Sequence, residues 1–301
     1  MHFPIADVII NPVFLAAIGF LVGILGGFFG VGGGFVAGPA MFLAGVPINF
    51  VVGTDLAHMT GKSIVAARRH RTLGQVDIKL GFLMVLGTVP GVEIGAQLVE
   101  RLKTVGNIDQ VIGSAYIVIL LVISIFTAWE SIRALRAVGT ESIAAEDALG
   151  FEAVARRIQT IRIPPMISLR GSGVESVSLW AVLGVGLITG VLVGVLGVGG
   201  GFIRMPLMVY LLGVPTHVAV GTDLFEVVVS AGYGTLTHAL KGNVDVLIAL
   251  VMHTGAAIGA QIGAVSTRFV RGPRIRLAFS LLPLIGAGLV LYRLLTGAGF
   301  E

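Results

Sequence analysis

The sequence predicts an all-α, polytopic integral membrane protein built from two inverted repeats of about five helical segments, some broken or re-entrant. Of its 301 residues, 55% are hydrophobic and only 12% are charged, and the mean hydropathy is +0.99. Soluble domains average about 25% charged residues, and disordered chains have low hydrophobicity, so both classes are excluded. The sequence contains no cysteine, which excludes disulfides, thiolate zinc sites and cysteine nucleophiles.

Uncharged stretches mark the predicted segments in order. Residues 8–54 carry no charge, which is enough for two passes or for a hairpin that enters the bilayer and returns. A glycine cluster at 30–34 divides this stretch. Eight further segments follow, at 52–70, 80–99, 108–130, 176–196, 198–213, 217–240, 244–266 and 276–296. Ten segments therefore form a first transmembrane repeat (1–130) and a second (176–301), joined by a connector (131–175).

The connector is polar and predicted to be cytoplasmic. Within it, Glu141–Gln159 is expected to form an amphipathic helix that Pro164 and Pro165 end. Fourteen lysines and arginines fall on the connector's side of the segments and four on the other side. Because cytoplasmic loops are enriched in these residues, this bias places both termini outside an inner or plasma membrane and explains the net charge of +4. The start of the chain lacks signal-peptide features, so the first segment is expected to stay.

The two halves repeat each other at an offset of 167 or 168 residues. Residues 29–35 (FGVGGGF) match 196–202 (LGVGGGF), and the later matches include Gly-Val-Pro, Gly-Thr-Asp-Leu and a histidine. Glycine triplets at 87, 91, 95 and at 255, 259, 263 also align, although a shared Gly-Ala-Gln favours a shift of one helical turn. An odd number of segments per repeat makes the second half enter from the opposite face, as in many secondary transporters.

These paired motifs resemble the TauE/SafE sulfite exporter family of membrane permeases. The resemblance covers nearly the whole chain apart from the connector. It implies transport of sulfite, sulfoacetate, thiosulfate or another small sulfur-containing or carboxylate anion. The thiosulfate-uptake branch is associated with essential cysteines, which this chain lacks.

The two glycine runs are the first candidate site. Glycine stretches inside a bilayer free backbone groups, which is tolerated only within protein or beside a wet cavity. A helix that restarts after such a run offers unpaired N–H groups and a positive dipole end to an anion. The proposed substrate-binding glycines are Gly32, Gly33, Gly34, Gly199, Gly200 and Gly201. The alternative is that they only permit close helix packing, which is the interpretation favoured for the two glycine triplets.

Charged residues inside the predicted segments are the second candidate site. Asp55, His58 and Lys62 share one helix face, and Asp223 and Glu226 occupy the positions that match Asp55 and His58. Ionisable groups at membrane depth usually face the protein interior and are functional. We expect Asp55, His58, Asp223 and Glu226 to manage a coupling proton and Lys62 to bind substrate. Two alternatives stay open: helix N-caps for the aspartates, and an internal ion pair between Lys62 and Asp55.

Arg204 lies three residues after the second glycine run and is a candidate specificity residue for an anion. Its alternative is an arginine that extends to the membrane interface. Glu93 is interpreted equally as a proton carrier or as a solvated helix end. His70 and His238 are interpreted as interfacial, and His217 and His253 as core or interface histidines.

The sequence therefore predicts a secondary transporter for a small anion, a sulfur oxyanion or organosulfonate, coupled to protons by alternating access. No enzyme activity, cofactor, metal site or nucleic-acid partner is expected, and the oligomeric state is left open, a homodimer included. An intramembrane enzyme that pairs Asp55 with Asp223, and a passive anion channel, are the alternatives. Substrate identity and the direction of transport are beyond the sequence.

Overall fold

We describe the chain from a computed structural model, which describes residues 1–30, 34–105, 108–137, 163–197, 200–270 and 272–296. The first half starts with a hairpin of β1 (His2–Phe3) and β2 (Val8–Ile9). Its helices are α1 (Pro12–Phe29), α2 (Gly34–Leu43), α3 (Ile48–Thr72), α4 (Ile78–Val105) and α5 (Ile108–Ala137).

The second half repeats this order. A hairpin of β3 (Met166–Leu169) and β4 (Val174–Ser178) encloses a 3-10 turn, Arg170–Ser172. The helices that follow are α7 (Leu179–Leu196), α8 (Gly201–Tyr210), α9 (Thr216–Leu240), α10 (Val246–Ser266) and α11 (Gly272–Thr296), with a 3-10 turn at Thr267–Phe269. Within the described residues, each of the ten predicted segments corresponds to one helix, and the predicted all-α class is confirmed. The predicted amphipathic helix at Glu141–Gln159 lies outside the described residues.

Both halves break their first helix at a glycine. The C-cap of α1 is Gly30 with φ 78°, and the C-cap of α7 is Gly197 with φ 71°; an L side chain is strained in this left-handed region. The helices that follow, α2 and α8, have 10 residues each. At 1.5 Å per residue this is about 15 Å, half the thickness of a bilayer core, so neither can span a membrane.

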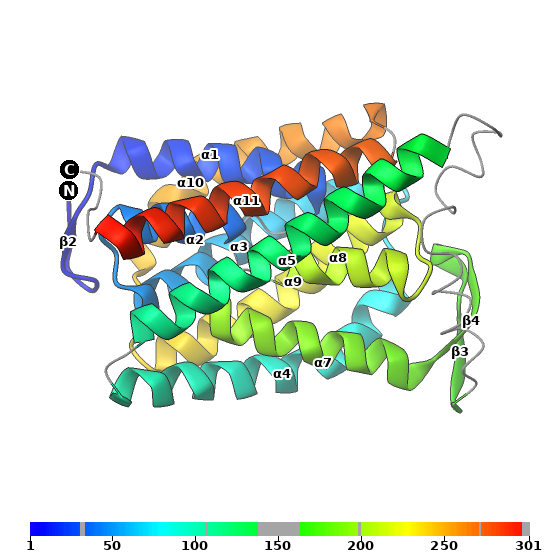
Figure 1. Cartoon of the computed structure of the whole chain (residues 1–301), viewed down its shortest axis with the longest axis horizontal. Helices are drawn as coiled ribbons and strands as arrows, with labels where there is room; N and C mark the ends of the chain where they lie inside the picture. The colour runs from blue at the N-terminus through cyan, green and yellow to red at the C-terminus, as the bar shows by residue number, and fades with distance from the viewer. Residues whose placement is uncertain (31–33, 106–107, 138–162, 198–199, 271, 297–301) are drawn as a thin grey trace.

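Six of the described helices have the length and apolar composition to cross a membrane: α1, α4, α5, α7, α10 and α11. In Figure 1 these helices lie roughly along the long axis of the molecule. The helices α3 and α9, with 25 residues each, are long enough to span but carry the charged residues of the candidate site. They pack against each other and against α10 and α4, so they form the centre of the bundle.

Glycines bring α1 onto α10 and α4 onto α7. A Cβ added at Gly23 would lie 2.8 Å from Cα of Ala256, and one added at Gly190 would lie 2.8 Å from Cα of Thr88. The two glycine triplets face the opposing backbones in the same way: Gly87, Gly91 and Gly95 meet Leu183, Leu187 and Val191, while Gly255, Gly259 and Gly263 meet Ala16, Phe20 and Ile24. The predicted packing role of the triplets is confirmed, and these contacts select the 168-residue register.

Threonine and aspartate join the halves by two crossed hydrogen bonds. The backbone N–H of Asp245 donates to Oγ1 of Thr54 over 2.9 Å, and that of Asp77 donates to Oγ1 of Thr222 over 2.8 Å. Equivalent positions of the repeat thus make equivalent contacts with the opposite half. In Figure 1, α1 and α7 start at opposite ends of the bundle; how this pattern lies in a bilayer stays a prediction.

His70 and His238 also form an equivalent pair. Nε2 of His70 donates to the carbonyl oxygen of Gly27 over 2.9 Å, and Nε2 of His238 donates to that of Gly194 over 3.1 Å. Both residues are fully buried. Each binds a carbonyl in the last turn of a broken helix, where carbonyl groups lack an intrahelical partner. Their position at the membrane interface stays a prediction.

The sequence patterns did not predict the two hairpins. They attach to the bundle through the same pair of aspartates. Asp77 accepts from Oγ of Ser172 over 2.6 Å, and Asp245 accepts from the N–H of Ala6 over 3.1 Å. Each aspartate also accepts from the N–H groups at the start of its own helix, so one carboxylate both caps a helix and holds the hairpin of the other half.

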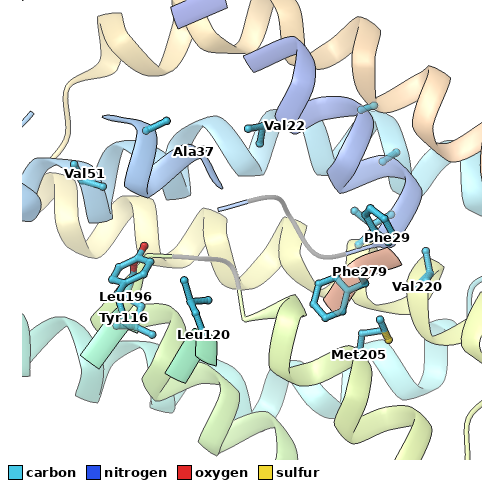
Figure 2. Close-up of a cluster of buried hydrophobic side chains, with 14 of the residues drawn as sticks. Val22, Phe29, Ala37, Val51, Tyr116, Leu120, Leu196, Met205, Val220 and Phe279 are labelled. Atoms are coloured by element: carbon cyan, nitrogen blue, oxygen red, sulfur yellow. The ribbon is translucent and has the colours of Figure 1, made fainter. Parts of the chain in front are cut away.

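Apolar side chains close the interior around the ends of α1 and α7 (Figure 2). Phe29 at the end of α1 lies against Phe279 of α11, with ring centroids 5.9 Å apart, beside Met205 and Val220. Near the end of α7, the hydroxyl of Tyr116 donates to the carbonyl of Leu196. The broken helices are therefore enclosed by protein, as backbone interruptions at membrane depth require.

Candidate functional site

One cluster of buried charges, the second-half cluster, consists of Arg204 on α8 and of Asp223 and Glu226 on α9. Nη1 of Arg204 lies 2.7 Å from Oδ1 of Asp223 and also forms an ion pair with Oε2 of Glu226. All three side chains have no exposed surface. Oγ of Ser230 donates to Oε2 of Glu226 over 3.0 Å. A single cation thus holds two carboxylates in the interior.

The remaining guanidinium nitrogens point toward the broken helix α7–α8. Nε of Arg204 donates to Oγ1 of Thr189 over 3.3 Å. Nη2 has no hydrogen-bond partner among the described residues and lies 2.9 Å from where a Cβ would stand on Gly200. Arg204 is fully buried, so the alternative of an arginine that extends to the membrane interface is wrong.

A second cluster, the first-half cluster, consists of Asp55, His58 and Lys62 on α3. Nδ1 of His58 lies 3.3 Å from Oδ1 of Asp55. Lys62 is 1% exposed, yet its Nζ has neither a hydrogen bond nor a carboxylate within ion-pair distance among the described residues. The alternative of an ion pair between Lys62 and Asp55 is therefore not what the structure shows.

A pocket between α5 and α8 differs from both charged clusters, because it is lined by apolar side chains such as Ile123, Ile203 and Leu207.

The two aspartates occupy equivalent positions within their helices. The helix α3 begins at Ile48 and α9 begins at Thr216, so Asp55 and Asp223 each lie about two turns inside a helix. The prediction that they lie near helix starts is wrong, and neither caps an N-terminus. Their hydrogen-bond partners differ, His58 for Asp55 and Arg204 for Asp223, and no hydrogen bond joins the two carboxyl groups in the part of the chain that the structure describes.

The glycine runs are only partly within the described residues. Gly34 begins α2, Gly200 is the N-cap of α8 with φ 70°, and Gly201 is the first residue of α8. Gly32, Gly33 and Gly199 lie outside the described residues. The structure therefore brings Gly200 next to Arg204, and the anion-binding role of all six glycines stays a prediction.

Glu93 and His253 lie outside the two clusters as first defined. Glu93 on α4 is partly exposed; it accepts from Nε2 of Gln97 over 3.0 Å and lies 3.9 Å from Nζ of Lys241, which favours a solvated helix surface over a buried proton carrier. His253 on α10 packs directly on Gly61 of α3. The sequence patterns missed this contact because His253 has no histidine partner in the repeat.

Residues 15–290 of the chain match the model of the sulfite exporter TauE/SafE family. The chain belongs to this family. This TauE/SafE protein is 28% identical over 291 residues to the probable membrane transporter protein YunE of Bacillus subtilis, covering 92% of this chain and 97% of YunE. It is 26% identical over 275 residues to YdhB of the same species, covering 91% and 97%.

A more distant relative of the TauE/SafE chain is the probable membrane transporter protein MJ0441 of Methanocaldococcus jannaschii. The two are 24% identical over 283 residues, which cover 88% of this chain and 90% of MJ0441. No solved structure matches the chain. Family membership and the six apolar helices identify this TauE/SafE protein as a multi-pass membrane transporter.

Proposed function

We propose that this protein is a secondary transporter for a small anion, either sulfite, sulfoacetate or another sulfur oxyanion or organosulfonate. One observation carries the proposal: two clusters of buried charged residues, each built around an aspartate at an equivalent position of α3 or α9, lie at the centre of the bundle. Arg204 and Lys62 provide buried cations in a protein that has few charges. The family's description as sulfite exporters supports the same substrate class.

The proposed binding groups are the two cations and the restarted helices at Gly32, Gly33 and Gly34 and at Gly199, Gly200 and Gly201. Arg204 already holds Asp223 and Glu226, so an entering anion competes with a carboxylate for the guanidinium. A proton that neutralises one carboxylate removes this competition. Asp223 and Glu226 in one half, and Asp55 and His58 in the other, therefore couple proton binding to anion binding.

Alternating access follows from the way in which the halves meet. Each half contributes one central helix, and the crossed hydrogen bonds from Asp245 to Thr54 and from Asp77 to Thr222 hold the two together. Movement of one repeat against the other would expose the centre to each side in turn. We propose an inner or plasma membrane location, with the connector cytoplasmic and both termini outside.

A flux assay tests the proposal. Purified protein in liposomes is expected to move labelled sulfite or sulfoacetate with saturable kinetics, and an imposed pH gradient is expected to drive accumulation. Gly184→Ala is the control variant, because a Cβ at Gly184 meets nothing within 4 Å. Absence of flux for every sulfur oxyanion and organosulfonate would contradict the substrate class. Flux that rises linearly with concentration would indicate a channel, and chemical conversion without flux would indicate an enzyme.

A further inference from the structure

His253 adds a third basic side chain to the first-half cluster. Its imidazole stacks on the backbone of α3: a Cβ added at Gly61 would lie 2.7 Å from Nδ1 and 3.1 Å from Nε2 of His253. Gly61 immediately precedes Lys62, and α10 packs along α3. The absence of a side chain at position 61 is what allows the ring to approach this close to the cluster.

Each of the three basic side chains has one buried nitrogen without a hydrogen bond among the described residues. Nζ of Lys62, Nε2 of His58 and Nδ1 of His253 are buried atoms without a hydrogen bond in the part of the chain that the structure describes. Lys62 and His58 are 1% exposed, and the charge of Lys62 acts on both imidazoles. Buried polar groups without partners are rare, and a buried ammonium without a counter-ion is strongly disfavoured. An anion with several acceptor atoms would supply hydrogen bonds to these nitrogens and a counter-charge to the ammonium.

We propose that Lys62, His58 and His253 form one pocket for the oxyanion end of the transported substrate, with His253 as the contribution of the second half. This inference rests on the proposed anion transport and deepens it. A sulfite or sulfonate group carries three oxygens, one for each of the three basic side chains, whereas a halide offers a single acceptor atom. Because α3 and α10 belong to different repeats, relative movement of the repeats changes the distance from Lys62 to His253 and with it the affinity for the anion.

His58 links this pocket to a proton. Its Nδ1 faces Asp55, so in the neutral ring Nδ1–H donates to Oδ1 and Nε2 bears a lone pair that repels an oxyanion. A proton taken from water onto Nε2 turns this atom into a donor. The titratable groups that face His58 are Asp55 and Lys62 on α3 and His253 on α10, and the charge of Asp55 also acts on Tyr116 of α5. Anion and proton therefore bind to this pocket together.

The second half cannot form the same pocket. At the repeat offset of 168 residues, His58 corresponds to Glu226, Lys62 to Ser230 and His253 to Val85. Only one basic pocket is thus expected per chain, and binding should have a stoichiometry of one anion.

Equilibrium binding of sulfite, sulfate and chloride to the purified protein in detergent tests this pocket. His253→Leu and Lys62→Met are each expected to weaken sulfite and sulfate binding by about 10-fold or more, the size of one charge-assisted hydrogen bond. His253→Gln, which keeps an N–H donor, should retain part of the affinity, whereas a purely structural role would make the Gln and Leu variants alike. Gly61→Ala, which displaces the ring but removes no donor, should also weaken binding.

Thr254→Ala is the matched control, because Thr254 is the exposed neighbour of His253 on the same helix. Wild-type protein that binds no oxyanion, or sulfite binding that His253→Leu leaves unchanged, would overturn the pocket. The same is true if the Leu variant loses chloride and sulfite affinity equally. Wild-type protein that binds sulfite in this way but moves none across liposomes would instead refute the proposed transport and keep the pocket.

Discussion

The first-half and second-half clusters share two equivalent positions, Asp55 with Asp223 and His58 with Glu226, but their cations lie at different positions and are paired differently. In the second half, Arg204 contacts two carboxylates and a threonine, so most of its donors are used. In the first half, Nζ of Lys62 has no hydrogen bond or close ion pair among the described residues, and the position equivalent to Arg204 is Ala37. The repeat therefore preserves the position of the aspartates, whereas each half has its cation at a position that is uncharged in the other half.

This difference in the pairing of the buried cations predicts different effects of substitutions on stability and on transport. Removing one member of a paired buried ion cluster leaves uncompensated charge behind, so such a cluster contributes to holding the fold. An unsatisfied cation contributes nothing favourable to the empty protein and gains its partner only when an anion binds. We therefore expect substitutions in the second-half cluster to affect stability most, and substitutions in the first-half cluster to affect binding and flux most.

The largest expected effect on stability is that of Arg204→Met. It leaves Asp223 and Glu226 side by side without a cation, which should lower the free energy of unfolding by about 3–5 kcal/mol. Denaturant titration in detergent micelles measures this. The triple variant Arg204→Met, Asp223→Asn, Glu226→Gln removes the stranded charges and should recover much of the loss. Equal stability of wild type and the single variant would end the distinction between the clusters.

The next largest effect on stability is expected at the glycine contacts between helices, which are equivalent in the two halves. Gly23→Ala and Gly190→Ala each place a Cβ 2.8 Å from an opposing Cα, so helix pairs α1–α10 and α4–α7 must separate. Overpacking of this kind costs about 1–3 kcal/mol. The same titration should give similar losses for both variants, whereas Gly184→Ala on α7 should be neutral or stabilising. A large loss for one glycine and none for the other would show that the helix pairs are not equivalent.

A smaller, also symmetric, effect is expected for Thr54→Val and Thr222→Val. Each removes one acceptor of the crossed hydrogen bonds to Asp245 and Asp77, which should cost about 1 kcal/mol. Unfolding measurements on the two single variants and the double variant test this. The double variant should show additive losses; a loss confined to one variant would contradict the equivalence of the two contacts.

Lys62→Met is expected to have the smallest effect on stability. It removes a buried ammonium that has no hydrogen bond among the described residues, so the free energy of unfolding should be unchanged or higher by about 1 kcal/mol. Sulfite flux in liposomes should nevertheless fall by about 10-fold or more. A destabilisation as large as that of Arg204→Met would mean that Lys62 holds the fold, and the contrast between the clusters would be lost.

Much of the architecture was predictable because lipid imposes simple rules. Uncharged stretches of about 20 residues must be helices at membrane depth, and this rule, together with the glycine runs and the repeat, gives the ten segments. The glycine triplets were recognisable as packing positions from their four-residue spacing. The start of α3 was misplaced because residues 48–51 are as apolar as the segment before them, and this error put Asp55 at a helix end instead of inside the helix.

The candidate site was predictable in its members more than in its contacts. Scarcity of charge made Asp55, Lys62, Arg204, Asp223 and Glu226 stand out, and the structure confirms that all are buried. The contacts between these residues could not be predicted, because the partners are far apart in the sequence. Arg204 and Asp223 are 19 residues apart on different helices, and His253 lies 192 residues beyond Gly61. Such pairs meet only through helix packing, which no local pattern encodes.

By itself, the sequence determined that this protein is helical, membrane-embedded and duplicated, because hydropathy and repeated motifs are properties of the chain alone. The tertiary structure decided which buried charges have partners. Ion pairing depends on distances of a few ångströms between side chains from different helices, and these distances arise only when α3, α8, α9 and α10 pack together. The repeat placed Asp55 and Asp223 at equivalent positions. Helix packing then paired Arg204 with two carboxylates, whereas Nζ of Lys62 has no hydrogen bond among the described residues.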